Sequence, residues 1–388
     1  MNFDLRLPEK LIFGWGRRVE AGGLARSLGT RAWLVAGSRT LEASGATGEL
    51  CRTLEETGIG VRRLPVLSRE PEVEDVDAAV AEVRGDLQPG DFVLGLGGGA
   101  AIDLAKAVSG LAPQESGTSV RDYLEGVGRG LQLIERPLPL LAMPTTSGTG
   151  AEATKNAVIS CSDPPFKKSL RDERLVPAAV LIDPELTVSN PASVTAHSGM
   201  DAITQLIESY VTKKATPFTR ALCREGLRLA IPALPAAVER PTDRGAREGM
   251  AYAAWLSGVA LANSGLGLAH GVAAALGVHC QVPHGLACAA LLPTAMRFNR
   301  DVRLREFAEL GALFTGQGFA SDAESADAAI GVIEELSQRV GVPQRLRDLG
   351  VREGQLDALA PASRGNSLSG NPREIDDAGL RELLGRLW

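Results

Sequence analysis

The stretch DFVLGLGGGAAIDLAKAVSG, residues 91–110, decides the fold of this chain. An apolar run typical of a buried strand leads into three consecutive glycines, and a helix is expected to begin at about Ala100. Glycines at such a turn let the backbone approach a phosphate, and the amides and dipole of the helix favour an anion. A tight turn that needs glycine for geometry alone is the alternative, but three glycines exceed what a turn requires. The stretch therefore predicts a strand–turn–helix unit that binds a phosphate.

Short apolar runs alternate with helical stretches up to about residue 184, whereas almost everything beyond has helical periodicity. This pattern predicts an α/β domain over residues 1–184, with a Rossmann-like parallel sheet covered on both faces, and an all-helical domain over 185–388. The other expected strands lie at 31–36, 60–65, 138–143 and 179–183, with a helix at 74–83 between two of them. The helices of the second half are expected at 201–211, 217–230, 246–263, 269–276, 285–292, 302–313, 323–340 and 377–387.

A second polar loop, PTTSGTGAE over residues 144–152, also follows an expected strand. Its Thr145, Thr146, Ser147 and Thr149 offer hydroxyl groups to a phosphate or a ribose, although Ser/Thr/Gly clusters are also ordinary loops. Because ligands of open α/β sheets bind at the carboxyl ends of strands, two such loops favour a nucleotide cleft.

Composition limits the class of protein. The 388 residues are 44% hydrophobic and 23% charged, which excludes bulk disorder, and 41 Lys and Arg against 47 Asp and Glu argue against a nucleic-acid surface. No apolar run approaches the roughly 20 residues of a membrane helix. The five cysteines form no C-x-x-C pair, so neither a disulfide framework nor a thiolate zinc site is indicated. With no signal-peptide pattern at the start, a cytoplasmic protein is expected.

Histidine is scarce, and two of the four histidines share a context. His270 and His284 are each followed by glycine at or near the start of an apolar helix. Asp201 and Gln205 share a face of another helix, with Glu208 one turn on, although a solvated polar face near a helix start is the alternative. Neutral imidazole and a carboxylate are ligands for zinc or ferrous ion, so these residues predict a metal site. Of the other two histidines, His279 is expected in a loop between the two helices, and His197 in a loop ahead of the acidic helix.

Taken together, these motifs resemble the iron-containing (group III) alcohol dehydrogenase family, which has a dehydroquinate synthase-like architecture. The resemblance implies an N-terminal dinucleotide-binding domain, a helical domain, a cleft with nicotinamide and a divalent metal, and a homodimer. The stretches that carry it are GLGGGAAIDLAKAVSG, PTTSGTGAEAT, LIDPEL, SGMDAITQLIESY, GLGLAHGVAAALG, VPHGLACAALLP and NPREIDDAGLRELL.

Residue by residue, the resemblance gives three sets of site residues. Gly97, Gly98, Gly99 and Asp103 match the family's pyrophosphate-binding turn. The hydroxyl residues of the second loop match the other nucleotide loop, and Lys168 is similar to a lysine that approaches the cofactor. Asp201, His270 and His284 match three of the family's four metal ligands.

The fourth metal ligand departs from the family pattern, since Gln205 stands where the family has a histidine. An amide oxygen is a neutral and poorer ligand for iron or zinc. Three outcomes stay open: Gln205 binds through its carbonyl oxygen or a water, the metal site is weak or absent, or His197 replaces the missing ligand.

The cofactor is expected to be NADP(H) rather than NAD(H). NAD-preferring members place an acid after the first strand, whereas this chain has Gly37, Ser38 and Arg39 there. Without the acid nothing repels a 2′-phosphate, which Ser38 and Arg39 could hold. The alternative is that Arg39 is a solvated loop residue.

The expected function is reversible hydride transfer between NAD(P) and a small alcohol, aldehyde or ketone, with Fe²⁺ or Zn²⁺ as a Lewis acid. The proton donor is His279 or a ribose–water network. Ala274 stands where many family members carry a further histidine. The alternatives are a metal-independent reductase of the same fold, a cyclase or lyase of the dehydroquinate synthase type, and a nucleotide-binding protein without turnover.

Overall fold

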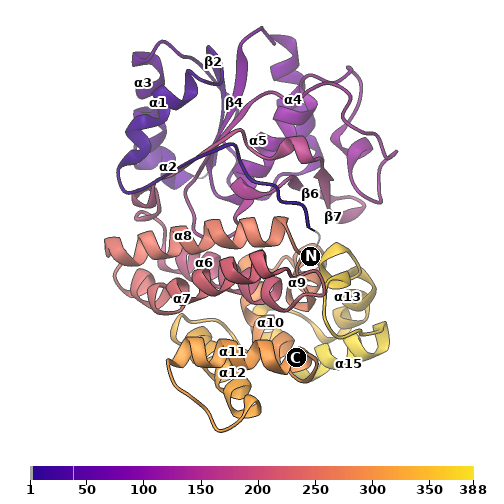
Figure 1. Cartoon of the computed structure of the whole chain (residues 1–388). Helices are drawn as coiled ribbons and strands as arrows, with labels where there is room; N and C mark the ends of the chain where they lie inside the picture. Colours follow the sequence, from indigo (N-terminus) through magenta and orange to yellow (C-terminus); the bar gives the residue numbers. More distant parts are fainter. Residues whose placement is uncertain (1–2, 38) are drawn as a thin grey trace. The chain divides into compact units, whose positions relative to one another are not determined.

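The computed structural model describes residues 3–37 and 39–388, and its contacts divide the chain into two compact units (Figure 1). The α/β unit comprises Arg6–Thr146 and Gly150–Asn190. The helical unit comprises residues 3–5, Ser147–Thr149 and residues 191–388. By these contacts the α/β unit ends at Asn190, and the expected boundary at residue 184 lies in the short segment before it.

A six-stranded parallel sheet forms the centre of the α/β unit, in the order β1-β8-β5-β4-β2-β3, which confirms the predicted fold class. From β2 the chain runs outward to the edge strand β3 and then returns to β4 on the other side of β2. The direction in which successive strands are added to the sheet therefore reverses between β2 and β4. Its strands are β1 (Lys10–Phe13), β2 (Arg31–Ala36), β3 (Gly60–Arg63), β4 (Asp91–Gly97), β5 (Leu140–Pro144) and β8 (Ala179–Ile182).

Helices cover both faces of the sheet. Successive side chains of a strand point to opposite faces, so each buried strand contributes apolar residues to both. Trp33 and Val35 of β2 pack in one apolar cluster with α4 and α5, whereas Leu34 packs in another with α1 and α3. Figure 1 shows α1 and α3 beside β2 at one side of this unit. The helices are α1 (Ala21–Ala25), α2 (Arg39–Ala43), α3 (Ala46–Glu56), α4 (Val73–Gly85) and α5 (Gly99–Leu111).

Three strands were missed in the sequence. The first is β1, an edge strand in which Ile12 is the one buried residue. The other two, β6 (Asn156–Ser162) and β7 (Pro165–Arg171), form an antiparallel pair. In β6 every second residue is buried, namely Ala157, Ile159 and Cys161, but the apolar Val158 between the first two hides the alternation.

The helical unit contains ten α-helices among its described residues, and α6, α7 and α8 pack against one another. Two of the ten, α13 and α14, were not expected from the sequence, and four others differ most in their bounds. The helix expected at 201 begins at Ala192, α9 extends to Cys280, and α7 and α10 continue through internal prolines. They are α6 (Ala192–Val211), α7 (Pro217–Glu239), α8 (Arg244–Ala262), α9 (Leu268–Cys280), α10 (His284–Asn299), α11 (Leu304–Thr315), α12 (Asp322–Arg339), α13 (Leu356–Ala362), α14 (Asn366–Ser369) and α15 (Asp377–Leu387).

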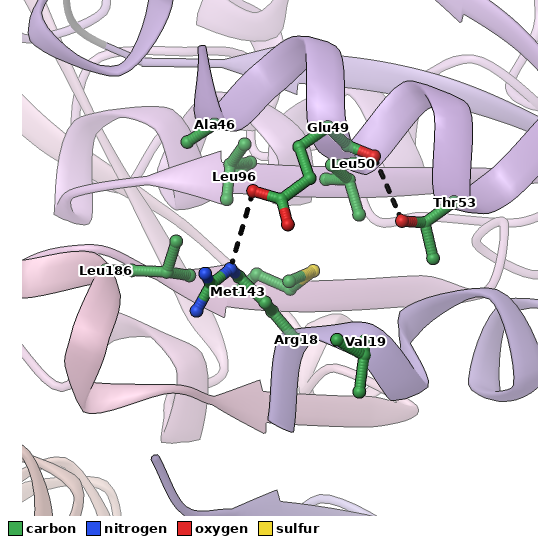
Figure 2. A pocket seen from close by; sticks show the side chains of 9 residues that line it. All are labelled: Arg18, Val19, Ala46, Glu49, Leu50, Thr53, Leu96, Met143 and Leu186. Carbon is green, nitrogen blue, oxygen red and sulfur yellow. Dashed lines mark hydrogen bonds and ion pairs between the residues drawn. The ribbon is translucent and has the colours of Figure 1, made fainter. Parts of the chain in front are cut away.

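The described part of the chain contains no helix long and apolar enough to cross a membrane. In the α/β unit, a small cavity of about 10 Å³ lies beneath α3, bounded by Leu50, Leu96 and Met143 (Figure 2). Arg18 and Glu49 pair at its edge, with 3.7 Å between guanidinium and carboxylate. A volume of this size holds about one water molecule, so the cavity is a packing defect and not a substrate site.

Candidate functional site

Two glycines lie close together in the α/β unit, at the ends of β2 and β4, where the strand order reverses. Gly37 follows β2, and Gly97 ends β4. The backbone N–H of Gly37 donates to Leu96 O over 2.8 Å, and that of Thr145 donates to Gly97 O over 2.9 Å. The loops after β2, β4 and β5 are therefore tied together at the carboxyl ends of their strands. In open parallel sheets this is where ligands bind.

Gly97 can only be glycine in this conformation. Its φ is +157°, and an added Cβ would lie 2.7 Å from Ala101 Cβ and 3.1 Å from Gly37 Cα. The next residue, Gly98, is the N-cap of α5 and offers no side-chain hydrogen bond to it. A Cβ added at Gly98 would lie 3.3 Å from the hydroxyl oxygen of Thr146, so this hydroxyl is beside the start of the helix. Backbone amides at this helix start and a hydroxyl beside them suit a phosphate.

A buried titratable group lies behind the glycine turn. The Lys106 ammonium donates to Thr154 Oγ1 over 2.6 Å and to Asn156 O over 2.9 Å. Asp103 lies 4.0 Å from it. Burial raises the pKa of Asp103 and lowers the pKa of Lys106, although each charge favours the other's ionised form. Burial also raises the pKa of the nearby Glu152 carboxyl to about 7. Asp103 is thus anchored beside Lys106, one turn into α5.

The remaining expected cofactor residues are placed as follows. Ser147 and Thr149 belong to the helical unit, where Gly148 lies against Ser198. The Ser147 hydroxyl is buried and has no hydrogen-bond partner within the described chain. Lys168 lies on β7, opposite Ile159. Ser38 and the side chain of Arg39 lie outside the described residues.

Within the helical unit, four side chains that can hold a metal converge from three helices. Asp201 comes from α6, His270 from α9, and His284 and Cys288 from α10. Their ligand atoms all lie within 4.8 Å of one another. Asp201 is 1% exposed, His270 5% and Cys288 0%. The three sequence-predicted ligands are thus brought together, with a cysteine that was not expected.

Two ligand atoms of this group are buried and lack hydrogen bonds. Asp201 Oδ1 and His270 Nε2 are 3.2 Å apart, yet neither has a hydrogen-bond partner in the described structure. Leaving such groups unsatisfied costs about 1–3 kcal/mol each. A cation held between them removes this cost, so the residues fit the metal that the sequence predicts.

Glu208, one helical turn beyond Gln205, holds both His270 and the start of α9. Its carboxylate accepts the Nδ1–H of His270 over 2.7 Å. It also accepts the backbone N–H of Gly267 at 3.0 Å and of Ala269 at 2.7 Å. A carboxylate on one imidazole nitrogen leaves the other nitrogen free to bind a metal. The solvated polar face considered from the sequence is wrong, since Asp201, Gln205 and Glu208 are all buried.

Gln205 is held by two hydrogen bonds. Its amide nitrogen donates to Asp201 Oδ2 over 3.1 Å, and its carbonyl oxygen accepts the Ser257 hydroxyl over 2.7 Å. Gln205 therefore orients Asp201 from behind, with its oxygen already engaged. The involvement of Ser257 was not expected from the sequence.

The other two histidines lie on helices, not in the loops expected for them. His197 is on α6, one turn before Asp201, because that helix begins directly after Pro191. His279 is in the last turn of α9, where its carbonyl accepts from Gln355 over 2.8 Å. Neither belongs to the four-residue group.

Comparison with known proteins gives the family. A model of "Iron-containing alcohol dehydrogenase" matches residues 8–184, and one of "Fe-containing alcohol dehydrogenase family, C-terminal" matches residues 195–388. The chain belongs to the iron-containing alcohol dehydrogenase family.

Individual relatives agree along the whole chain. The chain is 36% identical to the probable alcohol dehydrogenase EutG of Escherichia coli over 382 residues, covering 98% of this chain and 92% of that protein. It is 32% identical to the NAD-dependent methanol dehydrogenase of Bacillus methanolicus over 357 residues, 91% of each. A crystal structure of a 1,3-propanediol oxidoreductase has a TM-score of 0.93 at 31% identity, with both chains fully covered.

Membership in the family confirms the predicted enzyme class, an NAD(P)-dependent alcohol dehydrogenase. The family uses a divalent metal, and the four converging side chains are a candidate site for one. For this dehydrogenase the charges around the metal group favour a cation. Burial alone would raise the pKa of Asp201, but the two histidines outweigh it and lower that pKa. Burial alone would lower the pKa of His270, but Cys288, Asp201 and Glu208 raise it well above its usual value. Two carboxylates flank the imidazole of His270, and this arrangement favours a positive charge at the site, from a proton or from a metal.

Gly285→Ala should damage the metal group of this dehydrogenase through packing alone. A Cβ at Gly285 would lie 2.5 Å from the carbonyl oxygen of His197, which forces the start of α10 away from α6 and takes His284 with it. Overpacking of this kind costs about 1–3 kcal/mol. We expect a lower unfolding midpoint and weaker metal retention. Gly277→Ala, whose Cβ meets only Val282 O at 3.8 Å, is the control. Equal behaviour of the two variants would contradict the prediction.

Glu152→Gln should stabilise the enzyme in a pH-dependent way. Because the pKa of Glu152 is raised from 4.5 to about 7, the folded state holds its proton more tightly than the unfolded state does. Stability is therefore lost as the pH rises from about 4.5 to about 7, and the penalty is complete above that range, about 3 kcal/mol at most. Glutamine carries no such penalty. Urea unfolding at about pH 5 and about pH 8 should show a larger gain for the variant at the higher pH. A gain that does not grow with pH, or that the exposed Glu56→Gln also shows, would count against it.

Proposed function

We propose that this enzyme interconverts a small alcohol and its aldehyde or ketone with NADP(H), assisted by a divalent metal held by α6, α9 and α10. The observation that carries the proposal is a pair of buried ligand atoms, Asp201 Oδ1 and His270 Nε2, which lie 3.2 Å apart without a hydrogen bond of good geometry. When bound there, Fe²⁺ or Zn²⁺ supplies a Lewis acid that polarises the oxygen of the substrate.

The chain's own residues prepare this site. Glu208 fixes the ring of His270 and selects the tautomer whose Nε2 is free, through its 2.7 Å bond to Nδ1. Gln205 holds Asp201 Oδ2, so that Oδ1 is the oxygen presented. Neither His270 nor Asp201 has to reorganise when a cation arrives, and such preorganisation lowers the cost of binding.

The dinucleotide is proposed to bind in the α/β unit at Gly97, Gly98 and Gly99, with Thr145 and Thr146 beside them. This placement is supported by the loops after β2, β4 and β5, which are joined by hydrogen bonds at the point where the strand order reverses. A preference for NADP(H) is supported by the sequence after β2, where Gly37 is followed by Ser38 and Arg39 and no acid is present to repel a 2′-phosphate. Asp103, Ser147, Thr149 and Lys168 complete the proposed cofactor residues.

His279 stays a candidate proton donor, since it lies at the end of the helix that carries His270. Location in the cytoplasm and assembly as a homodimer also stay predictions. The first is supported by five free cysteines among the described residues, and the second by the resemblance to the family.

Two assays test the proposal. Protein purified without chelator should contain about one metal ion per chain, lose reductase activity on chelation, and regain it with ferrous or zinc ion. Full activity without bound metal would overturn the metal-assisted mechanism in favour of the metal-independent reductase. Initial rates on a panel of small aldehydes should give a higher kcat/KM with NADPH than with NADH. NADH at least as efficient would overturn the cofactor preference, and cofactor binding without turnover would leave only a nucleotide-binding protein.

A further inference from the structure

We propose that Cys288 is the fourth protein ligand of the metal and replaces the histidine that is absent at position 205. The site is then an Asp–His–His–Cys set, suited to Zn²⁺ or a similarly thiophilic divalent cation. This inference rests on the metal site of the proposed function and specifies its composition.

The position of Cys288 places its sulfur beside the other ligands. It lies four residues after His284 on α10, so both side chains project from the same face of that helix. Its Sγ is 3.7 Å from His284 Nε2 and within 4.8 Å of every other ligand atom of the group. The residue is completely buried.

Three of the six distances among the four ligand atoms are close to the edges of one tetrahedral site. With bonds of about 2.0–2.3 Å to zinc, neighbouring ligand atoms are about 3.3–3.6 Å apart. Asp201 Oδ1 lies 3.2 Å from His270 Nε2 and 3.8 Å from His284 Nε2. The 3.7 Å between Sγ and His284 Nε2 is the edge expected for a sulfur and a nitrogen. Each of these edges needs to change by no more than about 0.5 Å to match a zinc site.

Gln205 does not compete for the same place. Both ends of its amide are engaged, one with Asp201 and the other with Ser257. Its oxygen thus already has a partner in Ser257. The sulfur of Cys288 instead interacts with the proposed ligands themselves, namely His284 at 3.7 Å, His270 and Asp201.

Charge also favours the sulfur. A thiolate is a charged ligand that zinc binds well, whereas the amide oxygen of Gln205 is neutral and a poorer ligand. On binding, the S–H bond breaks, the proton leaves to solvent, and a sulfur–metal bond forms with no change of oxidation state.

Cobalt substitution tests the inference on the full chain. The protein loaded with Co²⁺ should show the near-ultraviolet thiolate-to-cobalt charge-transfer band, and Cys288→Ser should abolish it and weaken metal binding by more than about a hundredfold. Cys280→Ser, a cysteine outside the group, is the matched control and should keep the band. Zinc-edge X-ray absorption of the unaltered enzyme should show one sulfur at about 2.3 Å and needs no variant to fold.

The outcomes separate this inference from the proposed function. Bound cobalt without the band, or a zinc spectrum with only nitrogen and oxygen neighbours, would overturn the role of Cys288 and leave metal-assisted hydride transfer in place. A cobalt spectrum changed by Gln205→Ala but not by Cys288→Ser would overturn it in favour of the amide. A sulfur neighbour in an enzyme whose activity survives chelation would support the inference and overturn the proposed mechanism.

Discussion

Asp201→Asn is expected to remove the bound metal and to lower kcat/KM for aldehyde reduction by about 10³-fold, the equivalent of about 4 kcal/mol of transition-state stabilisation. The substitution keeps the size of the side chain and removes its charge. In the unaltered enzyme Asp201 Oδ1 lies 3.2 Å from His270 Nε2. In the variant either the amide oxygen or the amide nitrogen of asparagine takes that position, and neither carries a negative charge. The amino group also meets the donor of Gln205 if it takes the place of Oδ2.

The measurements for Asp201→Asn are metal content, kcat/KM and the affinity for NADPH. Affinity for the dinucleotide should persist, because its proposed residues in the α/β unit are untouched. Asp348→Asn, an exposed acid of the helical unit, should resemble the unaltered enzyme in all three. A metal content equal to that of the unaltered enzyme would contradict the assignment of Asp201 as a ligand.

Four strands of the central sheet could be predicted from the sequence because they are buried on both faces, namely β2, β4, β5 and β8. The apolar run of β4, in which all seven residues are buried, ends directly in glycine. By contrast, β1 presents one buried residue to the core. Its pairing with β8 depends on residues about 170 positions away, which no local pattern reports. The hairpin β6–β7 carried a usable sequence signal, because Ala157, Ile159 and Cys161 stand at every second position of β6 and are the residues that are buried.

Helix ends were harder to predict than helix existence. The segment before Asp201 is rich in small and polar residues and was interpreted as a loop, yet Thr195 and Ala196 are buried and helical. The helices expected to end at residues 230 and 292 are α7 and α10, and both continue past an internal proline. A proline removes one hydrogen bond from a helix, and the packing of these helices against their neighbours outweighs that loss.

The metal group was predicted only in part. Asp201, His270 and His284 carry sequence contexts of their own, whereas Cys288 was judged by the absence of a C-x-x-C pair. Its spacing of four from His284 was the signal that could have found it. Glu208 was seen one turn beyond Gln205, but nothing in a single sequence tells a buried carboxylate from a solvated one. The partner that decides its burial, the start of α9, is about 60 residues away.

Glu208→Gln is the second substitution with a large expected effect, because it acts on stability and on the metal at once. The carboxylate of Glu208 accepts from two backbone amides at the start of α9 and from His270 Nδ1. An amide in its place has one accepting oxygen, and its NH₂ group faces donors. At least one buried hydrogen bond to a charged group is lost, which costs about 1.5–3 kcal/mol, and an unsatisfied backbone N–H adds to that cost.

The effect on metal binding follows from the contact with Nδ1. Without a carboxylate there, neither the tautomer nor the orientation of His270 is fixed, and such losses weaken metal binding about 10–100-fold. We therefore expect Glu208→Gln to lower the unfolding midpoint of metal-free protein and to weaken zinc binding. At limiting zinc its activity should be low, whereas excess zinc should restore most of kcat.

Restoration by zinc distinguishes a positioning role from a purely structural one. If Glu208 only caps α9, the metal-free midpoint falls but the zinc affinity per folded chain stays at its original value. Glu225→Gln, which removes a surface carboxylate paired with Arg228, controls for loss of charge and should change neither quantity. Because Glu208 joins the cap of α9 to the imidazole of His270, both losses are expected together. A variant that loses stability without losing zinc affinity would show that His270 is oriented by packing alone.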